Sequence, residues 1–462
     1  MEGRDPLEGS PPGEAQVRTQ RRAAWPPNLL RVNEAARKGR QTKFTALLHH
    51  VDEASLRRSF HRLRRDASAG VDGETVAHYV ADLDANLASL CSRVHTGRYR
   101  PQPVRRVYIP KADGGQRPLG VPVLEDKLVQ GAVTEVLNAI YEADFVDASY
   151  GFRPRRSAHQ AVEAVRTMVM RDGANWVLEA DFRSFFDSVD HELLLRALAV
   201  RIADRRILRL IRQWLRAGVL ESGEWQATEA GTPQGAVISP LLANIFLHYA
   251  LDVWGAQWAR KQAQGRVFLV RYADDFVLGF TSETDARRME EALRDRMRCC
   301  RLMLHEAKTR LLEFGRVAAA RRAPRGERRP GTFNFLGFTL YCSTSRAGKF
   351  LVKCKTQSER MRRKLKTLRQ QAKQRRHTPL AYQHRWLSRV LRGHYAYYGV
   401  THNSLWLYRF FSRVRCLWYE VLRRRDGRRR LNWARFSALL AHFPLPPPRV
   451  ARPWQPVAGS LG

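Results

Sequence analysis

VFLVRYADDFVLGF, residues 267–280, is the stretch that decides the fold. Two arms of β-branched, aromatic and other apolar residues flank a short turn that carries Asp274 and Asp275 side by side. Such arms are typical of buried strands. Adjacent carboxylates repel each other, and among apolar residues their burial costs on the order of several kcal/mol unless a cation or a partner offsets it. The stretch therefore predicts a β-hairpin that presents two acidic groups in its turn.

A second acidic strand, WVLEADF at residues 176–182, carries Asp181 close to its end. Carboxylates without His or Cys suit the hard ion Mg²⁺, whose octahedron phosphate oxygens would complete. Two such ions, roughly 3.5–4 Å apart, would activate a 3′-hydroxyl and stabilise the departing pyrophosphate. An ordinary β-turn is the alternative for a lone Asp-Asp pair, but the apolar flanks and the separate Asp181 strand disfavour it. We therefore predict that Asp181, Asp274 and Asp275 are catalytic and bind two Mg²⁺ ions.

Two loop motifs are candidates for substrate contacts. IPKADGGQRPLG, residues 109–120, places Lys111 and Arg117 on a predicted hairpin, where they could hold a triphosphate. The alternative is two ordinary surface cations. AGTPQGAVISP, residues 230–240, surrounds Gln234 with small residues that would let a nucleotide and a template approach the backbone closely. A simple turn at the start of a helix is the alternative here.

Phe186 lies five residues after Asp181 in the motif SFFDS. An aromatic ring there is close enough to lie under the sugar of a bound nucleotide. Such a ring would leave no room for a 2′-hydroxyl, so it would favour dNTPs over NTPs. The alternative is that Phe186 is an ordinary core residue.

Composition points to a polyanionic partner. The 462-residue chain has a formal net charge of +37, which indicates nucleic acid or an anionic membrane surface. No run approaches about 18 apolar residues, and the first residues lack the apolar region of a secretory signal. The six cysteines show no CxxC spacing, which argues against a zinc knuckle and a disulfide scaffold. We therefore expect a protein of the bacterial cytoplasm that does not associate with membranes.

The positive charge is concentrated near the C-terminus. From Arg346 onward there are 28 Lys and Arg against three acidic residues. A solvated basic surface is the alternative to a phosphate-binding surface, but aromatic residues interleave with the charge throughout, as in proteins that bind nucleic acid. We predict that the cations of residues 355–376 bind RNA, namely Arg360, Arg362, Arg363, Lys364, Lys366, Arg369, Arg375 and Arg376.

Strands and helices alternate before residue 345, which predicts an α/β or α+β domain. After residue 355 the apolar residues recur at helical spacing, which predicts a separate helical domain. Residues 75–95 are expected to form one amphipathic helix that buries Val76, Val80, Leu83, Leu87 and Leu90. Residues 316–331 are expected to form a basic surface loop.

Seven blocks in order resemble the successive motifs of reverse transcriptases, specifically those encoded by bacterial group II introns. They are RRVYIPKADGGQRPLGVP, ASYGFRPRRSAHQAV, VLEADFRSFFDSVDH, GTPQGAVISPLLANIFLH, VRYADDFVLGF, LMLHEAKTRLLEFG and FNFLGFTLY. YADD, residues 272–275, is that family's form of the catalytic box. The stretch that begins LRGHYAYYGV at Leu391 resembles the family's maturase, or thumb, domain.

The resemblance implies an α+β right-hand polymerase, with fingers and an antiparallel palm sheet, followed by an all-helical thumb. It implies the metal-binding role of Asp181, Asp274 and Asp275, and it assigns Lys111, Arg117, Phe186, Gln234, Tyr272 and Lys308 to the nucleotide and primer site. The expected divisions are a disordered tail (1–27), a helical extension of the fingers (28–100), fingers and palm (101–345), thumb (346–430), and a DNA-binding remnant with a Pro-rich tail (431–462).

The resemblance also implies partners: intron RNA to be spliced, an RNA template with a DNA primer, dNTPs and a target DNA. The chain ends about 30 residues after LNWARF without paired CxxC motifs, so we expect it to lack a second-strand nicking domain. A pre-existing primer would then be required. Two alternatives stay open: a related reverse transcriptase with another task, such as repair or phage defence, and a non-enzymatic RNA-binding splicing cofactor.

Overall fold

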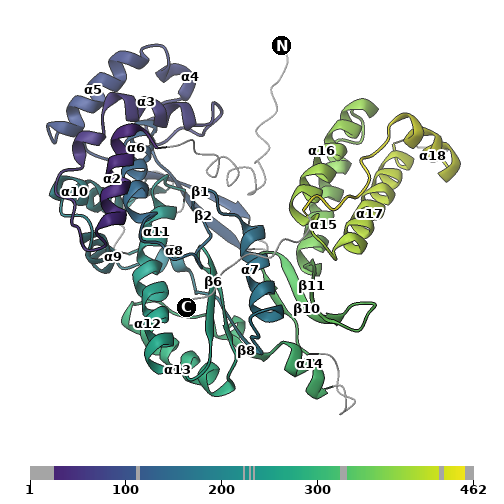
Figure 1. Ribbon diagram of the computed structural model, residues 1–462. Helices are drawn as coiled ribbons and strands as arrows, with labels where there is room; N and C mark the ends of the chain where they lie inside the picture. Colours follow the sequence, from purple (N-terminus) through teal and green to yellow (C-terminus); the bar gives the residue numbers. More distant parts are fainter. Residues whose placement is uncertain are drawn as a thin grey trace.

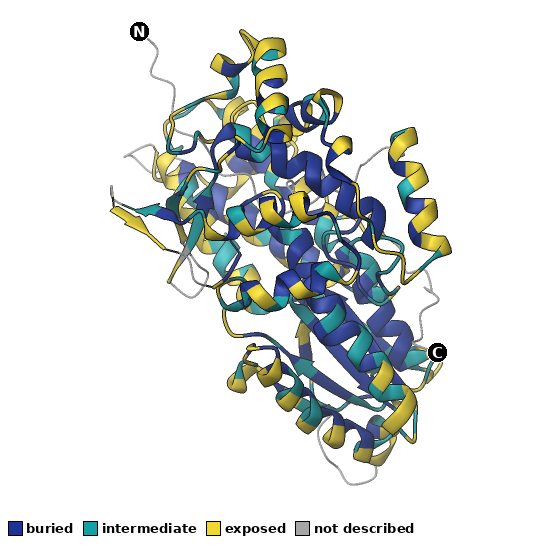
Figure 2. Ribbon diagram, turned by 90° about the vertical axis from the view of Figure 1, so that its left-hand side faces the viewer, coloured by how far each residue is buried: buried dark blue, intermediate teal, exposed yellow. Residues whose placement is uncertain are grey.

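The computed structural model describes residues 25–110, 115–221, 224–227, 230–232, 235–322, 330–425 and 431–452. It is a mixed α/β structure with a helical C-terminal region, as the sequence predicts (Figure 1). The buried residues gather in the central helices and strands, and the outer helices carry the exposed ones (Figure 2). No helix in these ranges has the length and apolar character that crossing a bilayer requires.

The N-terminal helices pack around α6 (Leu124–Tyr141), which is buried along almost its whole length. They are α2 (Pro27–Lys38), α3 (Glu53–Arg62), α4 (Val76–Tyr79) and α5 (Leu83–His95). The single helix expected over residues 75–95 is wrong, because the chain turns between Tyr79 and Leu83. That turn shifts the phase of the apolar residues, so Tyr79 is buried and Val80 is 49% exposed.

A four-stranded sheet of order β2-β1-β4-β5 follows these helices. It lies in the predicted fingers and is called the fingers sheet below. Its predicted hairpin is confirmed: β1 (Val104–Pro110) pairs antiparallel with β2 (Gln116–Val121), from Arg105 opposite Val121 to Pro110 opposite Gln116. The two short strands that complete the sheet are β4 (Val219–Glu221), which is parallel to β1, and β5 (Glu224–Gln226).

A second four-stranded sheet, of order β6-β7-β3-β8, is antiparallel throughout. It lies in the predicted palm and is called the palm sheet below. It contains the predicted hairpin, β6 (Val267–Tyr272) and β7 (Asp275–Phe280), with β3 (Trp176–Ala180) and β8 (Arg310–Glu313). Helix α7 (Ala158–Met170) packs on one face and α13 (Glu283–Cys299) on the other. Because both faces are covered, the strands read as continuous apolar runs rather than as alternating patterns.

Four further helices connect these sheets. They are α8 (Phe185–Ser188), α9 (His191–Ala199), α10 (Arg205–Arg216) and a long helical stretch made of α11 (Ser239–Leu247), a π-helical turn (His248–Asp252) and α12 (Val253–Gln262). Asp190 caps α9, because its side chain accepts a hydrogen bond from the Leu193 amide.

A three-stranded sheet joins the palm to the C-terminal helices. Its strands are β9 (Phe333–Phe335), β10 (Phe338–Thr344) and β11 (Phe350–Thr356). The division expected between residues 345 and 346 falls inside the β10–β11 hairpin, where Thr344 pairs with Phe350. The all-helical part therefore begins only at Ser358. Its helices, called the thumb helices below after the predicted domain, are α15 (Ser358–Gln374), α16 (Leu380–Tyr398), α17 (Ser404–Arg423) and α18 (Trp433–His442).

One segment expected to form a loop is partly helical, and the Pro-rich segment packs against a helix. Residues Arg316–Arg322 form helix α14, so the predicted loop over 316–331 is wrong there, and residues 323–329 lie outside the described part. The first part of the Pro-rich C-terminal segment, residues 443–452, lies along α16. There the Tyr395 hydroxyl donates to the Pro446 carbonyl over 3.2 Å, and the Ala451 amide donates to the Gly399 carbonyl over 2.8 Å. The N-terminal tail, residues 1–24, also lies outside the described part.

Candidate active site

The β6–β7 hairpin and β3 bring the three predicted aspartates to one end of the palm sheet. Tyr272 pairs with Asp275, and the turn between them contains Asp274. Because β3 pairs with β7 up to Ala180 opposite Phe276, the next residue of β3 in this register, Asp181, faces Asp275. Adjacent strands lie about 4.8 Å apart, so carboxylates at these positions share one surface.

The charges of the other two aspartates act on Asp275. Its pKa is raised to about 7, first by burial and then by the negative charges of Asp274 and Asp181. The positive charges of Arg360 and Lys308 lower it in part. A divalent cation would relieve this crowding of negative charge, since it favours the ionised form of every carboxylate it binds.

Lys308 contacts this acidic cluster directly. It ends the short 3₁₀ helix Glu306–Lys308, and its Nζ lies 2.6 Å from Oδ2 of Asp181. The backbone of Asp181 is held as well, because its carbonyl accepts a hydrogen bond of 2.7 Å from the amide of His305. Lys308, which the sequence linked to the site only through the family resemblance, thus stands 127 residues away in the chain but beside the first aspartate.

The donor chemistry of the cluster fits a hard divalent ion. Three carboxylates supply oxygen ligands only, which is the preference of Mg²⁺. Within the described residues, no three His, Cys, Asp or Glu side chains form a ready set of metal ligands. The charges of Asp274 and Asp181 raise the pKa of Asp275, and Asp181 pairs with Lys308. Mg²⁺ usually takes only one or two carboxylates and completes its shell with water and phosphate oxygens.

Phe186 and the glycine-rich motif, two separate predictions, lie side by side. Phe186 is half-buried in α8, with its ring edge-on to Phe185 at a centroid distance of 5.4 Å. The Thr232 amide donates to the Phe186 carbonyl over 2.7 Å. Gly231 has φ +91°, and a Cβ atom there would lie 2.8 Å from the Phe186 carbonyl oxygen. Only glycine permits this close approach.

The same motif reaches the fingers sheet at its other end. Gly235 has φ +112°, and a Cβ atom there would lie 2.6 Å from the carbonyl oxygen of Gly120 on β2. Arg117 is on the same strand, paired with Ile109, although its side chain is not among the described groups. Lys111 and Gln234 lie outside the described residues, so their roles stay predictions.

Tyr272 differs from an exposed nucleotide contact. It is 6% exposed and belongs to the core between the palm sheet and α7. Burial raises the pKa of its hydroxyl, and the charge of Asp275 adds to that effect. A role of Tyr272 in nucleotide binding stays a prediction.

The basic residues predicted to bind RNA do not share one environment. Arg362, Lys366 and Arg369 are exposed on α15, and Arg369 pairs with Glu420 over 3.2 Å. Lys364 instead packs over the ring of Phe410 at 5.7 Å, and burial lowers its pKa. Arg375 lies over Trp386 at 5.1 Å. Two more predicted contacts, Arg363 and Arg376, are half-exposed, and Arg360 acts on Asp275 as described above.

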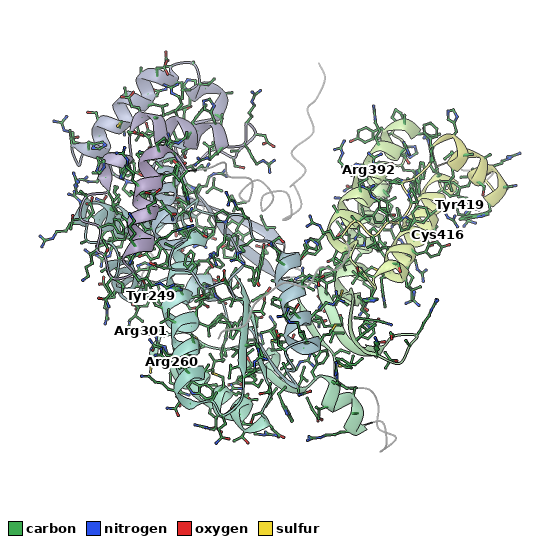
Figure 3. The ribbon with its side chains drawn as sticks, viewed as in Figure 1. Tyr249, Arg260, Arg301, Arg392, Cys416 and Tyr419 are labelled. Atoms are coloured by element: carbon green, nitrogen blue, oxygen red, sulfur yellow. The ribbon has the colours of Figure 1, made fainter. Side chains whose placement is uncertain are left out.

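The C-terminal helices add groups that the sequence did not single out. Arg392 on α16 and Cys416 on α17 are exposed, and Tyr419 lies near Cys416 on α17 (Figure 3). Arg423 lies 5.8 Å from the Tyr419 ring, and Arg409 lies 4.9 Å from that of Trp406. Alternating guanidinium groups and aromatic rings are typical of surfaces that bind single-stranded nucleic acid.

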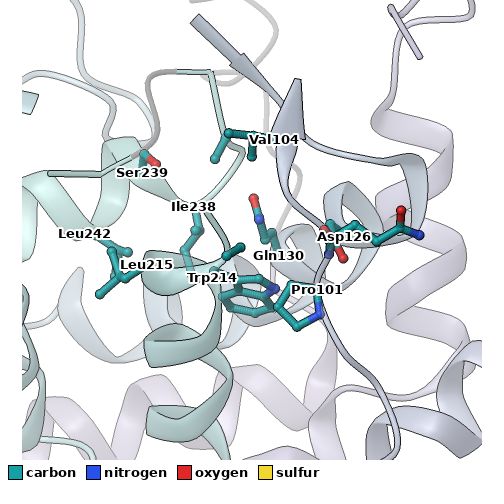
Figure 4. A pocket seen from close by; sticks show the side chains of 12 residues that line it. Pro101, Val104, Asp126, Gln130, Trp214, Leu215, Ile238, Ser239 and Leu242 are labelled. Carbon is teal, nitrogen blue, oxygen red and sulfur yellow. Dashed lines mark hydrogen bonds between the residues drawn. The ribbon is translucent and has the colours of Figure 1, made fainter. Parts of the chain in front are cut away.

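A small cavity behind the fingers sheet is lined by residues of β1, α6, α10 and α11 (Figure 4). Its one acidic group, Asp126, accepts hydrogen bonds from the Tyr99 hydroxyl and the Gln102 amide, and burial raises its pKa to about 7. Gln130 accepts a hydrogen bond of 3.0 Å from the Val237 amide. The residues that line the cavity support the segment that follows Gly235.

Sequence reasoning missed the buried polar residues behind the hairpin turn, namely Arg271, Asp252 and Asn244. Arg271 and Asp252 have no exposed surface, and Arg271 donates hydrogen bonds to the other two. An arginine inside an otherwise apolar strand, directly before the acidic turn, was the available signal, because a charge is buried only with a partner.

Comparison with known proteins places this site in a family. A model of the reverse transcriptase (RNA-dependent DNA polymerase) domain matches residues 109–340. Protein YkfC of Escherichia coli is 39% identical over 252 residues, 48% of this chain and 66% of that protein. The group II intron-encoded protein LtrA of Lactococcus lactis is 43% identical over 166 residues, 36% of this chain and 27% of that protein.

A third relative, an uncharacterized 91 kDa protein in the cob intron of Schizosaccharomyces pombe, is 46% identical over 146 residues, 32% of this chain and 18% of that protein. The matches thus span two thirds or less of each relative's length. Reverse transcriptases generally use divalent metal ions, which agrees with the oxygen-rich cluster at the end of the palm sheet. The domain match covers half of the chain and all three aspartates, and the chain therefore belongs to the reverse transcriptase family.

Proposed function

We propose that the protein is an RNA-directed DNA polymerase of a group II intron, which copies the intron RNA into cDNA by two-metal nucleotidyl transfer. The observation that carries this proposal is the clustering of Asp181, Asp274 and Asp275 at one end of the palm sheet of a reverse transcriptase domain. A carboxylate such as Asp275, whose pKa is raised by burial and by neighbouring carboxylates, is a candidate for a catalytic site.

The chain's own groups have separate tasks in this scheme. Two Mg²⁺ ions, when bound by the aspartates, would lower the pKa of the primer 3′-hydroxyl and neutralise the charge of the departing pyrophosphate. Phe186 would lie under the sugar of the incoming dNTP, beside the backbone of Gly231 and Thr232. Lys111 and Arg117 would hold the triphosphate from the fingers hairpin. Lys308 pairs with Asp181 and supports the primer end.

We further propose that the protein acts as a maturase, which binds the intron RNA and promotes its splicing and its movement into a target DNA. Two observations support this role. The relative LtrA is by name an intron-encoded protein. The segment from residue 346 onward is strongly basic, and its described part carries the arginine–aromatic contacts of α17.

Primer extension tests the polymerase. An oligo(dT) primer on poly(rA) is incubated with dTTP and Mg²⁺, and wild type is compared with Asp274→Ala. We expect wild type to extend the primer and the variant to lose activity by on the order of 10³-fold or more, as for other residues that bind catalytic metals. Asp295→Ala, at an exposed position of α13, is the matched control and should extend normally. Wild type as inactive as Asp274→Ala would exclude the enzyme and favour an RNA-binding cofactor.

RNA binding tests the intron-specific role. The affinity of the protein for RNA transcribed from the DNA that flanks the reading frame is compared with its affinity for the antisense RNA of the same length. We expect tighter binding of the sense RNA and faster splicing in the presence of the protein. Equal affinity for both strands, with intact primer extension, would favour a related reverse transcriptase with another task.

A further inference from the structure

Three buried polar side chains meet directly behind the turn that carries Asp274 and Asp275. Arg271 and Asp252 have no exposed surface, and Asn244 is 1% exposed. Charged residues are almost never buried to this extent unless each has a partner. The cluster therefore depends on hydrogen bonds, which join its members to one another and to the turn.

Arg271 uses both sides of its guanidinium group. Nε and Nη2 donate to the two carboxylate oxygens of Asp252, over 2.7 and 2.5 Å. Nη1 donates over 2.9 Å to Oδ1 of Asn244 and over 2.9 Å to the carbonyl oxygen of Ala273. The bidentate pair fixes the plane of the guanidinium, so the hydrogen bond to Ala273 has a defined direction.

Ala273 is the residue of the turn that most needs such support. It has φ +56°, in the left-handed region that residues other than glycine rarely adopt. The turn is also enclosed from behind, because a Cβ atom on Gly151 would lie 2.1 Å from the Ala273 nitrogen. Asn244 holds that enclosing loop through a 2.7 Å hydrogen bond to the Gly151 carbonyl. One network thus contacts both sides of the turn.

The π-helical turn at His248–Asp252 explains how one helical stretch supplies two partners for Arg271. Asn244 and Asp252 are eight residues apart, which in a regular α-helix separates two side chains by about 80° around the axis. A π-turn accommodates one extra residue, and this brings the two positions back to about the angle of an i, i+7 pair. Short π-helical segments often occur at functional sites, which fits their use here.

We propose that Arg271 is a positioning residue for catalysis: held by Asp252 and Asn244, it fixes the Ala273 carbonyl and thereby the backbone from which Asp274 and Asp275 reach the metal ions. This inference rests on the proposed function of the three aspartates. The ion pair of Arg271 and Asp252 then has a role beyond stability, because Arg271 also donates a hydrogen bond to the turn that carries the aspartates.

The test replaces the buried pair by apolar residues of similar size, in the double variant Arg271→Met/Asp252→Leu. Removing both charges avoids an unpaired buried charge, which would unfold the protein for trivial reasons. The matched control is Arg201→Met/Asp144→Leu. Arg201 is 1% exposed, lies 3.2 Å from Asp144 and donates to the Gly39 and Ala36 carbonyls. Those partners lie outside the palm sheet.

Three quantities are measured for both double variants: the midpoint of thermal unfolding, the affinity for Mn²⁺ without substrate by electron paramagnetic resonance, and kcat and KM for single-nucleotide addition. We expect the Arg271 variant to lose about tenfold or more in Mn²⁺ affinity and in kcat, with KM for primer–template unchanged. The control should change only the midpoint. Asn244→Ala should give a smaller loss in the same two quantities.

The outcomes separate this inference from the proposed function. Mn²⁺ affinity and kcat of the Arg271 variant within twofold of the control would overturn the inference. Wild type that binds Mn²⁺ at the site, as judged by loss in Asp274→Ala, but does not extend a primer would overturn only the proposed function. Wild type that binds no Mn²⁺ sensitive to Asp274→Ala would overturn both.

Discussion

The palm and the thumb differ in the sign and the arrangement of the charges that they present. The palm gathers carboxylates at the end of a sheet that is buried on both faces, and the charge of Lys308 offsets part of theirs. The thumb distributes cations over the surface of three helices and stacks several of them on aromatic rings. Position therefore matters for single residues in the palm, whereas in the thumb the number of exposed cations matters.

The thumb nevertheless uses part of its charge internally. Lys364 packs over Phe410, Arg369 pairs with Glu420, and Arg375 covers Trp386. A count of basic residues thus overstates the number available to phosphates. In the palm, by contrast, Lys308 is paired directly with Asp181 at the site.

The two regions have separate hydrophobic cores, which gives the largest expected effect. Trp418 is 1% exposed in the thumb core, and its Nε1 donates to Gln383 over 3.0 Å. Trp418→Ala should cost about 3–5 kcal/mol and weaken RNA binding, whereas Leu178→Ala in the palm should cost about 2–5 kcal/mol and weaken metal binding. Scanning calorimetry with both binding assays measures this. A single transition that both variants shift equally would break the comparison.

The second effect concerns substrate choice in the palm. Phe186→Val should raise the use of NTPs relative to dNTPs by about 10–100-fold, because it opens space beside the sugar. Steady-state incorporation of dTTP and UTP measures the ratio. Phe185→Leu is the control: Phe185 is 3% exposed and faces the core, so this change should affect stability only. An unaltered ratio in Phe186→Val would refute its assignment as the sugar gate.

The third effect tests which thumb cations reach the RNA. Arg362→Gln/Lys366→Gln should reduce RNA affinity about tenfold and flatten its salt dependence by roughly 0.7–0.9 per lost phosphate contact. Lys364→Met should leave both unchanged, because that ammonium lies over Phe410. Filter binding across a range of salt concentrations measures this. An equal loss in Lys364→Met would show that total charge, not exposure, decides binding.

The smallest effect is the pH dependence of the palm. Because folding raises the pKa of Asp275 to about 7, the folded state holds this proton more tightly than the unfolded state. The contribution of this group to stability is therefore largest below about pH 4 and is lost as the pH rises toward 7. In EDTA at pH 8, Asp275→Asn should be more stable than wild type by about 1 kcal/mol, since solvent screens the half-buried group. Urea unfolding measures the difference. A stability difference of the same size at pH 4 would contradict the assignment.

Much of the palm could be predicted because its signals are local. The apolar arms of residues 267–280 fix the hairpin, and the acids in its turn indicate the chemistry. Contacts between distant segments could not be predicted from pattern, such as Lys308 beside Asp181. Arg271 was missed because a single arginine in a strand does not reveal its partner, which a π-turn supplies. The sequence predicted that Val80 would be buried, but Tyr79 is buried in its place because a turn changes the helical phase.

The first turn of α15 gives the protein an electrostatic link between its two regions. Arg360 lies on that helix, and its charge acts on the carboxylate of Asp275. A ligand that moves this helix would change the electrostatic field at the three aspartates. By thermodynamic reciprocity, cation binding at the aspartates would then change the affinity for that ligand by the same factor. On the proposed function, template binding and cation binding are thus coupled.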